Sequence, residues 1–95
     1  MIHLTSVRKG RIGELLVVND LLRKGYDVYT PVIDDNGIDL VVMNGNLIKK
    51  VQCKSPDSAI GKYQTSIEVN TRGCGKSDVI AVPLKQRIVY AISLL

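Results

Sequence analysis

The sequence predicts an α/β fold in which an N-terminal helix packs on a mixed β-sheet of about five to six strands. One stretch near the N-terminus has helical apolar spacing, and the rest of the chain alternates short apolar runs with turn residues. The hydrophobic fraction of 45% provides a core that must rest on Val, Ile and Leu, because Trp and Phe are absent. β-Branched side chains favour strands. A length of 95 residues fits a single domain spanning 1–95.

The predicted helix spans residues 7–24. Thr5 and Ser6 can cap its start, and Gly25 ends it in the usual C-terminal manner. We expect its main apolar arc to face the sheet. That arc consists of Leu15, Val17, Val18, Leu21 and Leu22.

The predicted strands are separated by turn signals. They span 26–31, 38–43, 47–54, 63–70, 78–84 and 87–93. Residues 34–37 form a polar turn, and Asn44-Gly45-Asn46 is a strong hairpin signal. The strands at 38–43 and 47–54 are therefore expected to be antiparallel neighbours.

Composition excludes several classes of protein. Cys53 and Cys74 cannot form a disulfide framework, and His3 is the only histidine, which argues against a structural zinc site. No signal peptide or membrane-spanning run is visible, so we expect an intracellular, cytoplasmic protein without a membrane partner. The net charge of +4 suits a polyanion, although ordinary domains share such a balance.

Glu14 is the polar residue that interrupts the apolar arc of the helix. A carboxylate on a buried face is costly unless it is paired or binds a cation. The alternative is a Glu in the first part of the helix whose head reaches solvent and favours the helix dipole. Taken alone, Glu14 favours this second interpretation.

Asp39, Gln52 and Lys54 are the polar residues of the predicted hairpin. Strand alternation places Gln52 and Lys54 on one face, with Val51 and Cys53 on the core side. Taken singly, Asp39 is equally well explained as the end of a polar turn. The same holds for Gln52 and Lys54, which fit a solvated strand face.

Antiparallel pairing brings these residues to the same end of the sheet. A carboxylate, an amide oxygen and the main-chain carbonyl of Cys53 are oxygen ligands suited to Mg²⁺ or Mn²⁺. Such a metal lowers the pKa of water, and Lys54 would contact the nucleophile or the scissile phosphate.

The ordered set of motifs resembles the PD-(D/E)XK nuclease superfamily. The matching motifs are Gly10-x-x-Gly13-Glu14, Gly25-Tyr26-x-Val28, Gly37-Ile38-Asp39-Leu40 and Val51-Gln52-x-Lys54. Archaeal Holliday-junction resolvases, small homing endonucleases and Mrr-like restriction enzymes are similar over this stretch.

The resemblance implies a restriction-endonuclease-like core and a metal-dependent DNA endonuclease. It implies that Glu14 and Asp39 help to hold the metal and that Lys54 is the catalytic lysine, with Gln52 as the remaining site residue. The chain departs from the family pattern at Ile38, where the family has Pro, and at Gln52, where Glu or Asp is usual. Gln52 is similar to the QxK variant of Mrr-like enzymes, and it removes one negative charge from the site.

Basic residues suggest where duplex or branched DNA would bind. Arg8, Lys9 and Arg11 stand at the helix start, and Lys62, Arg72 and Lys76 follow later in the chain. A solvated surface loop explains the later group equally well. Gly75-Lys76-Ser77 is not a nucleotide-binding phosphate loop, because Asn70 stands where the pattern needs Gly, and no nucleotide cofactor is expected.

Three functional hypotheses follow. The first is a DNA endonuclease, either structure-specific (junction-resolving) or site-specific, acting as a homodimer through Ile12 and Leu16 on the far side of the helix. Alternatively, Ile12 and Leu16 are simply exposed apolar residues, which are common on protein surfaces. The second is a catalytically inactive nucleic-acid-binding module, favoured by Gln52. The third is a small subunit of a larger assembly.

Overall fold

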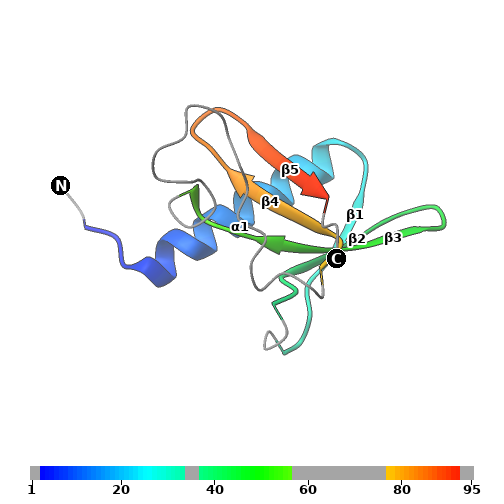
Figure 1. Ribbon diagram of the computed structural model, residues 1–95, viewed down its shortest axis with the longest axis horizontal. Helices are drawn as coiled ribbons and strands as arrows, with labels where there is room; N and C mark the ends of the chain where they lie inside the picture. Colours follow the sequence, from blue (N-terminus) through cyan, green and yellow to red (C-terminus); the bar gives the residue numbers. More distant parts are fainter. Residues whose placement is uncertain (1–2, 34–36, 57–76, 93–95) are drawn as a thin grey trace.

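The computed structural model describes residues 3–33, 37–56 and 77–92. They form one helix and a five-stranded sheet (Figure 1). In chain order the elements are α1 (Ser6–Arg23), β1 (Asp27–Tyr29), β2 (Leu40–Asn44), β3 (Leu47–Cys53), β4 (Val79–Pro83) and β5 (Ile88–Ile92). The predicted strand at 63–70 lies outside the described residues.

The sheet follows chain order, β1-β2-β3-β4-β5. All neighbouring pairs are antiparallel except β3 and β4, which are parallel. The β2–β3 hairpin pairs Leu40 with Val51 and Asn44 with Leu47, and Gly45 turns the chain with a φ of +61°. The prediction of a helix on a mixed sheet is confirmed.

The start and end of α1 follow from local chemistry. The Thr5 hydroxyl accepts a hydrogen bond from the Arg8 backbone N–H at 3.2 Å, which satisfies one of the free amides of the first turn. At the other end the chain turns at Gly25, which has a φ of +90°. A positive φ favours glycine, so the predicted stop signal acts as expected.

One layer of the core lies between α1 and the sheet. Its buried members are Val17, Leu21, Leu40, Val42, Val51 and Ala81. Val18 and Cys53 pack against this cluster and are half-buried. On the other face of β4, Ile80 and Val82 form a second buried cluster with Leu84 and Val89 packed against it.

The predicted apolar arc of the helix is only partly correct. Val17 and Leu21 are buried, but Leu15 is 51% exposed and Leu22 is 55% exposed. The helix therefore contacts the sheet along a narrower stripe than the arc. On the same side, a Cβ added at Gly13 would lie 3.2 Å from Pro83 Cγ, so the helix and β4 approach closely there. No helix in the described part of the chain is long and apolar enough to cross a membrane.

Candidate active site

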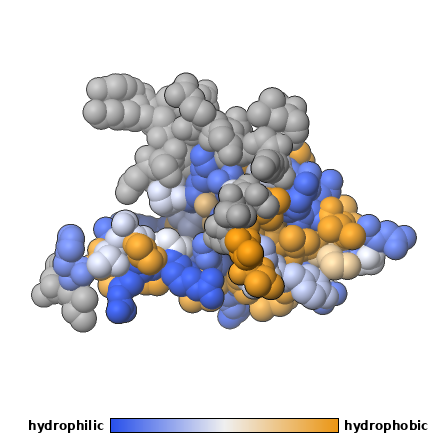
Figure 2. Space-filling model, turned by 90° about the horizontal axis from the view of Figure 1, so that it is seen from below, coloured by the Kyte–Doolittle hydropathy of each residue, from blue (hydrophilic) through white to orange (hydrophobic). Residues whose placement is uncertain are grey.

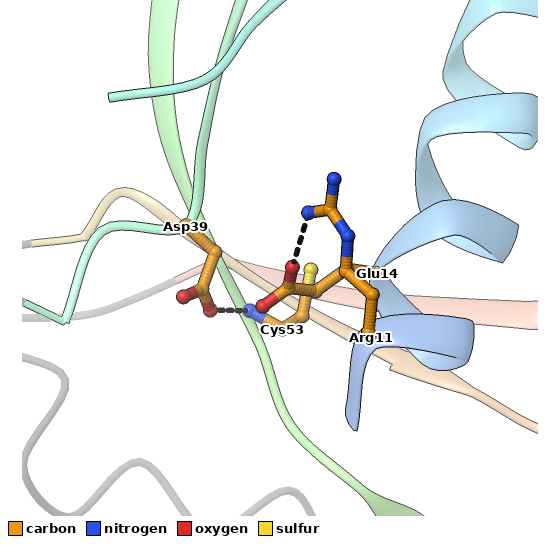
Figure 3. A network of polar contacts seen from close by, with 4 residues as sticks. All are labelled: Arg11, Glu14, Asp39 and Cys53. Atoms are coloured by element: carbon orange, nitrogen blue, oxygen red, sulfur yellow. Dashed lines mark hydrogen bonds and ion pairs between the residues drawn. The ribbon is translucent and has the colours of Figure 1, made fainter. Parts of the chain in front are cut away.

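A cleft of about 730 Å³ lies between the first half of α1 and the adjoining end of the sheet. Glu14, Asp39, Gln52 and Lys54 all line it, together with Cys53. Sequence reasoning placed Asp39 and Lys54 at one end of the sheet, and the shared cleft agrees with that placement. Figure 3 shows Glu14 extending from the helix toward Asp39 and Cys53.

Asp39 is fixed by backbone contacts just before β2. Its N–H donates to the Val51 carbonyl at 2.9 Å, and its Oδ2 accepts from the Cys53 N–H at 2.7 Å (Figure 3). The carboxylate therefore closes the open end of the hairpin. Because it accepts a backbone N–H at short range, its orientation is well defined.

Gln52 lies on β3 on the face opposite Val51, as alternation predicted. Among the described residues, its Oε1 is the buried side-chain polar atom that has no hydrogen-bond partner. A buried amide oxygen without a partner is unfavourable by about 1–3 kcal/mol. Its Nε2 would lie 3.5 Å from a Cβ at Gly37, whose φ is +74°. The loop before Asp39 thus packs closely against this amide.

Glu14 is neither fully buried nor free in solvent. Its side chain is 25% exposed, and its Oε2 accepts from Arg11 Nη1 at 3.0 Å (Figure 3). The sequence left two interpretations open, a buried carboxylate that needs a partner and an exposed one. The structure shows a half-buried carboxylate with a guanidinium partner from the preceding turn of the helix.

Lys54 follows the last residue of β3. Its N–H donates to the Ala81 carbonyl at 2.9 Å, which extends the parallel β3–β4 pairing by one bond and fixes the backbone at the cleft. Ser55 and Pro56 continue the cleft wall. These two residues were not among the predicted site residues, and nothing in their sequence context distinguishes them from an ordinary turn.

The predicted DNA-binding residues fall into two groups. Arg8, Lys9 and Arg11 are exposed on the first half of α1, and Lys9 lines the cleft. The other three, Lys62, Arg72 and Lys76, lie outside the described residues. The same is true of Cys74.

The residues at the cleft fit a hard divalent cation in part. Two carboxylates and an amide oxygen that has no partner in the described part of the chain are oxygen donors of the kind that Mg²⁺ and Mn²⁺ prefer. Within the described residues, no group of three or more His, Cys, Asp or Glu side chains is placed to hold a metal ion. Gln52 adds a neutral amide oxygen to the two carboxylates at this place.

A separate polar cluster joins the other end of α1 to β5. The Tyr90 hydroxyl donates to Asp20 Oδ2, and Lys24 Nζ lies 3.0 Å from the same oxygen and 4.7 Å from the Tyr90 ring centre. The hydrogen bond from Tyr90, reinforced by Lys24, lowers the pKa of Asp20. Burial and the Asp20 carboxylate raise the pKa of Tyr90. This cluster lies at the end of the helix away from the cleft, so we assign it to stability.

The fold and the residues gathered at the cleft define a protein of the restriction-endonuclease-like class. The chain belongs to the PD-(D/E)XK endonuclease family, whose model matches residues 4–91. This confirms the superfamily that the sequence motifs resemble. PD-(D/E)XK nucleases generally use divalent metal ions.

The chain is also similar to individual proteins, among them a phage protein and a bacterial homing endonuclease. It is 30% identical to Protein 5.3 of Escherichia phage T7 over 94 residues, an alignment that spans 92% of this chain and 76% of the phage protein. The bacterial homing endonuclease I-Ssp6803I has a similar structure, with a TM-score of 0.72 and 19% identity over 95% of this chain and 67% of that one. At this low identity the structural match supports the fold.

Proposed function

We propose that the protein is a metal-dependent DNA endonuclease that hydrolyses phosphodiester bonds at the cleft. The observation that carries the proposal is that Glu14, Asp39, Gln52 and Lys54 line one cleft although they come from three separate segments of the chain. The buried oxygen of Gln52, which lacks a partner among the described residues, supports a ligand at this place. We further propose that residues 1–95 act as one domain.

The proposed cation ligands are Glu14, Asp39, Gln52 and the main-chain carbonyl of Cys53, with Mg²⁺ preferred and Mn²⁺ as a substitute. A cation bound there would lower the pKa of water and offset charge on the phosphate. Lys54 would contact the scissile phosphate and stabilise the negative charge that grows in the transition state. The bond from the Cys53 N–H holds Asp39 in a fixed orientation, so that little reorganisation is needed on binding.

The proposed substrate is duplex or branched DNA, cut at a junction or at a specific site. Arg8, Lys9 and Arg11 provide positive charge beside the cleft, where the phosphate backbone would lie. The later basic residues Lys62, Arg72 and Lys76 are proposed to add to this surface. Positive charge attracts the phosphates of a junction and of linear duplex alike, so the two substrates are distinguished by comparing how fast each is cut.

The test is cleavage of a labelled supercoiled plasmid and a synthetic four-way junction with Mg²⁺, Mn²⁺ or EDTA. We expect cutting only with metal, and a loss of at least about 100-fold in Asp39→Asn and in Lys54→Ala. Lys49→Ala is the control, because Lys49 is exposed on β3 and lines a groove at the other end of the sheet. Cutting in EDTA, or wild-type rates in both site variants, would contradict the proposal.

A DNA-binding module without turnover is the second candidate, and the neutral Gln52 favours it. Fewer acids in the site mean a weaker hold on a cation. This candidate predicts DNA binding without cutting under any metal. The plasmid and junction assay therefore separates the two functions when DNA binding is measured on the same samples.

We also propose a homodimer that uses the exposed apolar residues Ile12 and Leu16 of α1. Ile12 and Leu16 are 46% and 47% exposed and also line the cleft, so a second copy bound there would stand at its rim. Apolar side chains are exposed over several parts of the face in Figure 2. Light scattering should give twice the chain mass for the wild type and the single mass for Leu16→Glu. A wild type that stays monomeric at high concentration would contradict the dimer.

A further inference from the structure

The ion pair between Arg11 and Glu14 connects the cleft with the exposed surface of α1 (Figure 3). Arg11 Nη1 lies 3.0 Å from Glu14 Oε2, and the Arg11 side chain is 62% exposed while that of Glu14 is 25% exposed. Glu14 lines the cleft, whereas more than half of the Arg11 side chain is in solvent. Arg11 can therefore leave Glu14 for another anion without moving the helix.

The balance of charge at the cleft makes this pairing important. Its lining contains two carboxylates, Glu14 and Asp39, and two ammonium groups, Lys9 and Lys54. Gln52 adds an oxygen without a charge. When Arg11 sits on Glu14, positive groups outnumber negative ones, and a divalent cation gains the least attraction from the site.

A DNA phosphate competes directly for the Arg11 side chain. Guanidinium groups bind phosphate and carboxylate with the same forked geometry, so a backbone phosphate is a suitable alternative partner. Arg11 belongs to the basic segment at the helix start, which includes Arg8 and Lys9. A phosphate bound along this segment would lie next to the side chain that now holds Glu14.

We propose that Arg11 competes with the divalent cation for Glu14 and, once displaced, binds a DNA phosphate. This inference rests on the proposed function, because it takes Glu14 as a cation ligand. DNA that engages Arg11 makes the carboxylate available, and a cation that engages Glu14 makes the guanidinium available. The two ligands then bind cooperatively, and the coupling is reciprocal. Arg11 is a positioning residue in this scheme.

Mn²⁺ affinity in the absence of DNA tests the first half of the proposal. The four proteins are wild type, Arg11→Ala, Glu14→Gln and the double variant, with free Mn²⁺ measured by electron paramagnetic resonance. We expect Arg11→Ala to bind Mn²⁺ on the order of two- to five-fold more tightly than wild type, as for an exposed ion pair. In the Glu14→Gln background the change at Arg11 should have an effect no larger than that of Arg8→Ala.

Arg8→Ala is the matched control because it removes one positive charge from the same exposed part of the helix. Arg11→Lys keeps the charge and should restore most of the wild-type Mn²⁺ affinity. A purely structural role of Arg11 would change the melting temperature in EDTA without changing Mn²⁺ affinity.

DNA affinity in EDTA tests the second half with the same four proteins. We expect Glu14→Gln to bind a fluorescently labelled duplex on the order of two- to five-fold more tightly than wild type, because its Arg11 has lost the competing carboxylate. The gain should disappear when Arg11 is also replaced by Ala. An equal gain in both backgrounds would mean that only the overall charge matters, and would overturn the exchange.

The inference is also overturned if Arg11→Ala has the same Mn²⁺ affinity as Arg8→Ala. It is likewise overturned if Arg11→Ala binds Mn²⁺ more weakly than wild type. Asp39→Asn separates this result from a failure of the proposed function. Suppose that Asp39→Asn abolishes Mn²⁺ binding while Arg11→Ala and Arg8→Ala have equal Mn²⁺ affinities. The proposed cation site is then supported, and only the competition between Arg11 and the cation for Glu14 is wrong. If Asp39→Asn leaves both Mn²⁺ affinity and cutting unchanged, the proposed site and the exchange are both wrong.

Discussion

At the scale of single residues, Gln52 sets the character of the cleft. It supplies a buried oxygen at the place where many members of this family carry an acid, and that oxygen has no partner among the described residues. The cost of leaving it unpaired disappears once a cation or a donor reaches it. Gln52 therefore offers a cation a well-placed oxygen that carries no negative charge.

Gln52→Glu tests that combination. The added negative charge should raise Mn²⁺ affinity on the order of ten-fold, since ligand charge is a main determinant of affinity. In EDTA the same change should lower stability by about 1–3 kcal/mol, because a carboxylate would be buried without a cation. The measurements are Mn²⁺ affinity and the melting temperature with and without Mn²⁺. Gln86→Glu, at an exposed position, is the matched control.

An unchanged Mn²⁺ affinity in Gln52→Glu would show that this side chain does not face the cation.

Neither the burial of the Gln52 Oε1 nor the absence of its partner was visible in the sequence. Alternation gave the face of β3, but the depth of the cleft depends on how closely the loop at Gly37 and the helix approach. Those are properties of packing between distant segments.

At the scale of elements, the close contact between α1 and β4 depends on the absence of a side chain at Gly13. A Cβ at Gly13 would meet Pro83 Cγ at 3.2 Å, whereas a Cβ at Gly10 would meet nothing within 4 Å. Pro83 has a rigid ring and cannot move aside without shifting β4. Gly10 and Gly13 lie on the same helix but differ in this contact, so an alanine at Gly10 is the control for an alanine at Gly13.

Gly10→Ala should stabilise the protein by about 0.5–1 kcal/mol through helix propensity alone. Gly13→Ala should forfeit that gain and be less stable than Gly10→Ala by about 1–2 kcal/mol, because the added methyl overpacks the contact. Urea denaturation of both variants checks this difference. Equal stabilisation by both changes would mean that the helix can move away from Pro83.

The Asp20–Tyr90 bond gives the other end of α1 a predictable pH dependence. The folded protein lowers the pKa of Asp20 below its ordinary value of 3.8, so this contribution to stability is present above that pH and lost as pH falls below it. The pKa of Tyr90 is raised above its ordinary 10.0, so its contribution is present below pH 10.0 and lost as pH rises further.

Tyr90→Phe should cost about 1 kcal/mol near neutral pH, a modest value because both groups are partly exposed. The variant should also lack the alkaline loss of stability and show a weaker acid loss, since Lys24 still pairs with Asp20. Denaturant unfolding at pH values below 3.8, near neutrality and above 10.0 measures both effects. Tyr29→Phe, at an exposed position on an edge strand, should leave the whole profile unchanged.

Elements with local signals were predictable from sequence, and contacts between elements were not. The Thr5 cap, the Gly25 stop and the hairpin turn at Asn44-Gly45-Asn46 are each encoded in a few adjacent residues. By contrast, Leu15 and Leu22 were assigned to the core and are exposed, because amphipathic spacing does not specify the angle at which a helix meets a sheet.

At the scale of the whole molecule, the net charge of +4 should make DNA binding sensitive to salt. If Arg8, Lys9 and Arg11 each neutralise one phosphate, affinity should fall roughly forty-fold between about 50 and 200 mM salt. Arg8→Ala should reduce the slope of log K against log salt by about 0.9. Lys49→Ala should leave the slope unchanged, since Lys49 lies away from the cleft. An equal change of the salt slope in Arg8→Ala and Lys49→Ala would indicate that DNA binds to the protein without preferring the surface around the start of α1.

The strand order was predictable only where strands are joined by a short turn. The β2–β3 hairpin was predictable from sequence. It places Asp39 and Lys54 at the same end of the sheet, where both line one cleft. The parallel pairing of β3 with β4 did not, because the two strands are distant in the chain and no local signal specifies which edge β4 joins. Glu14 reaches the cleft through the equally non-local packing of the helix.

The length of the Asn44-Gly45-Asn46 turn determines which side chains of β3 reach the cleft. Side chains alternate along a strand, so inserting or deleting one residue in this turn would exchange the two faces of β3 relative to β2. Val51 and Cys53 would then take the place of Gln52 and Lys54, and the Asp39 carboxylate would lose its bond to the Cys53 N–H. A change of length in this exposed turn, remote from the cleft, should therefore be more damaging than most substitutions within the cleft.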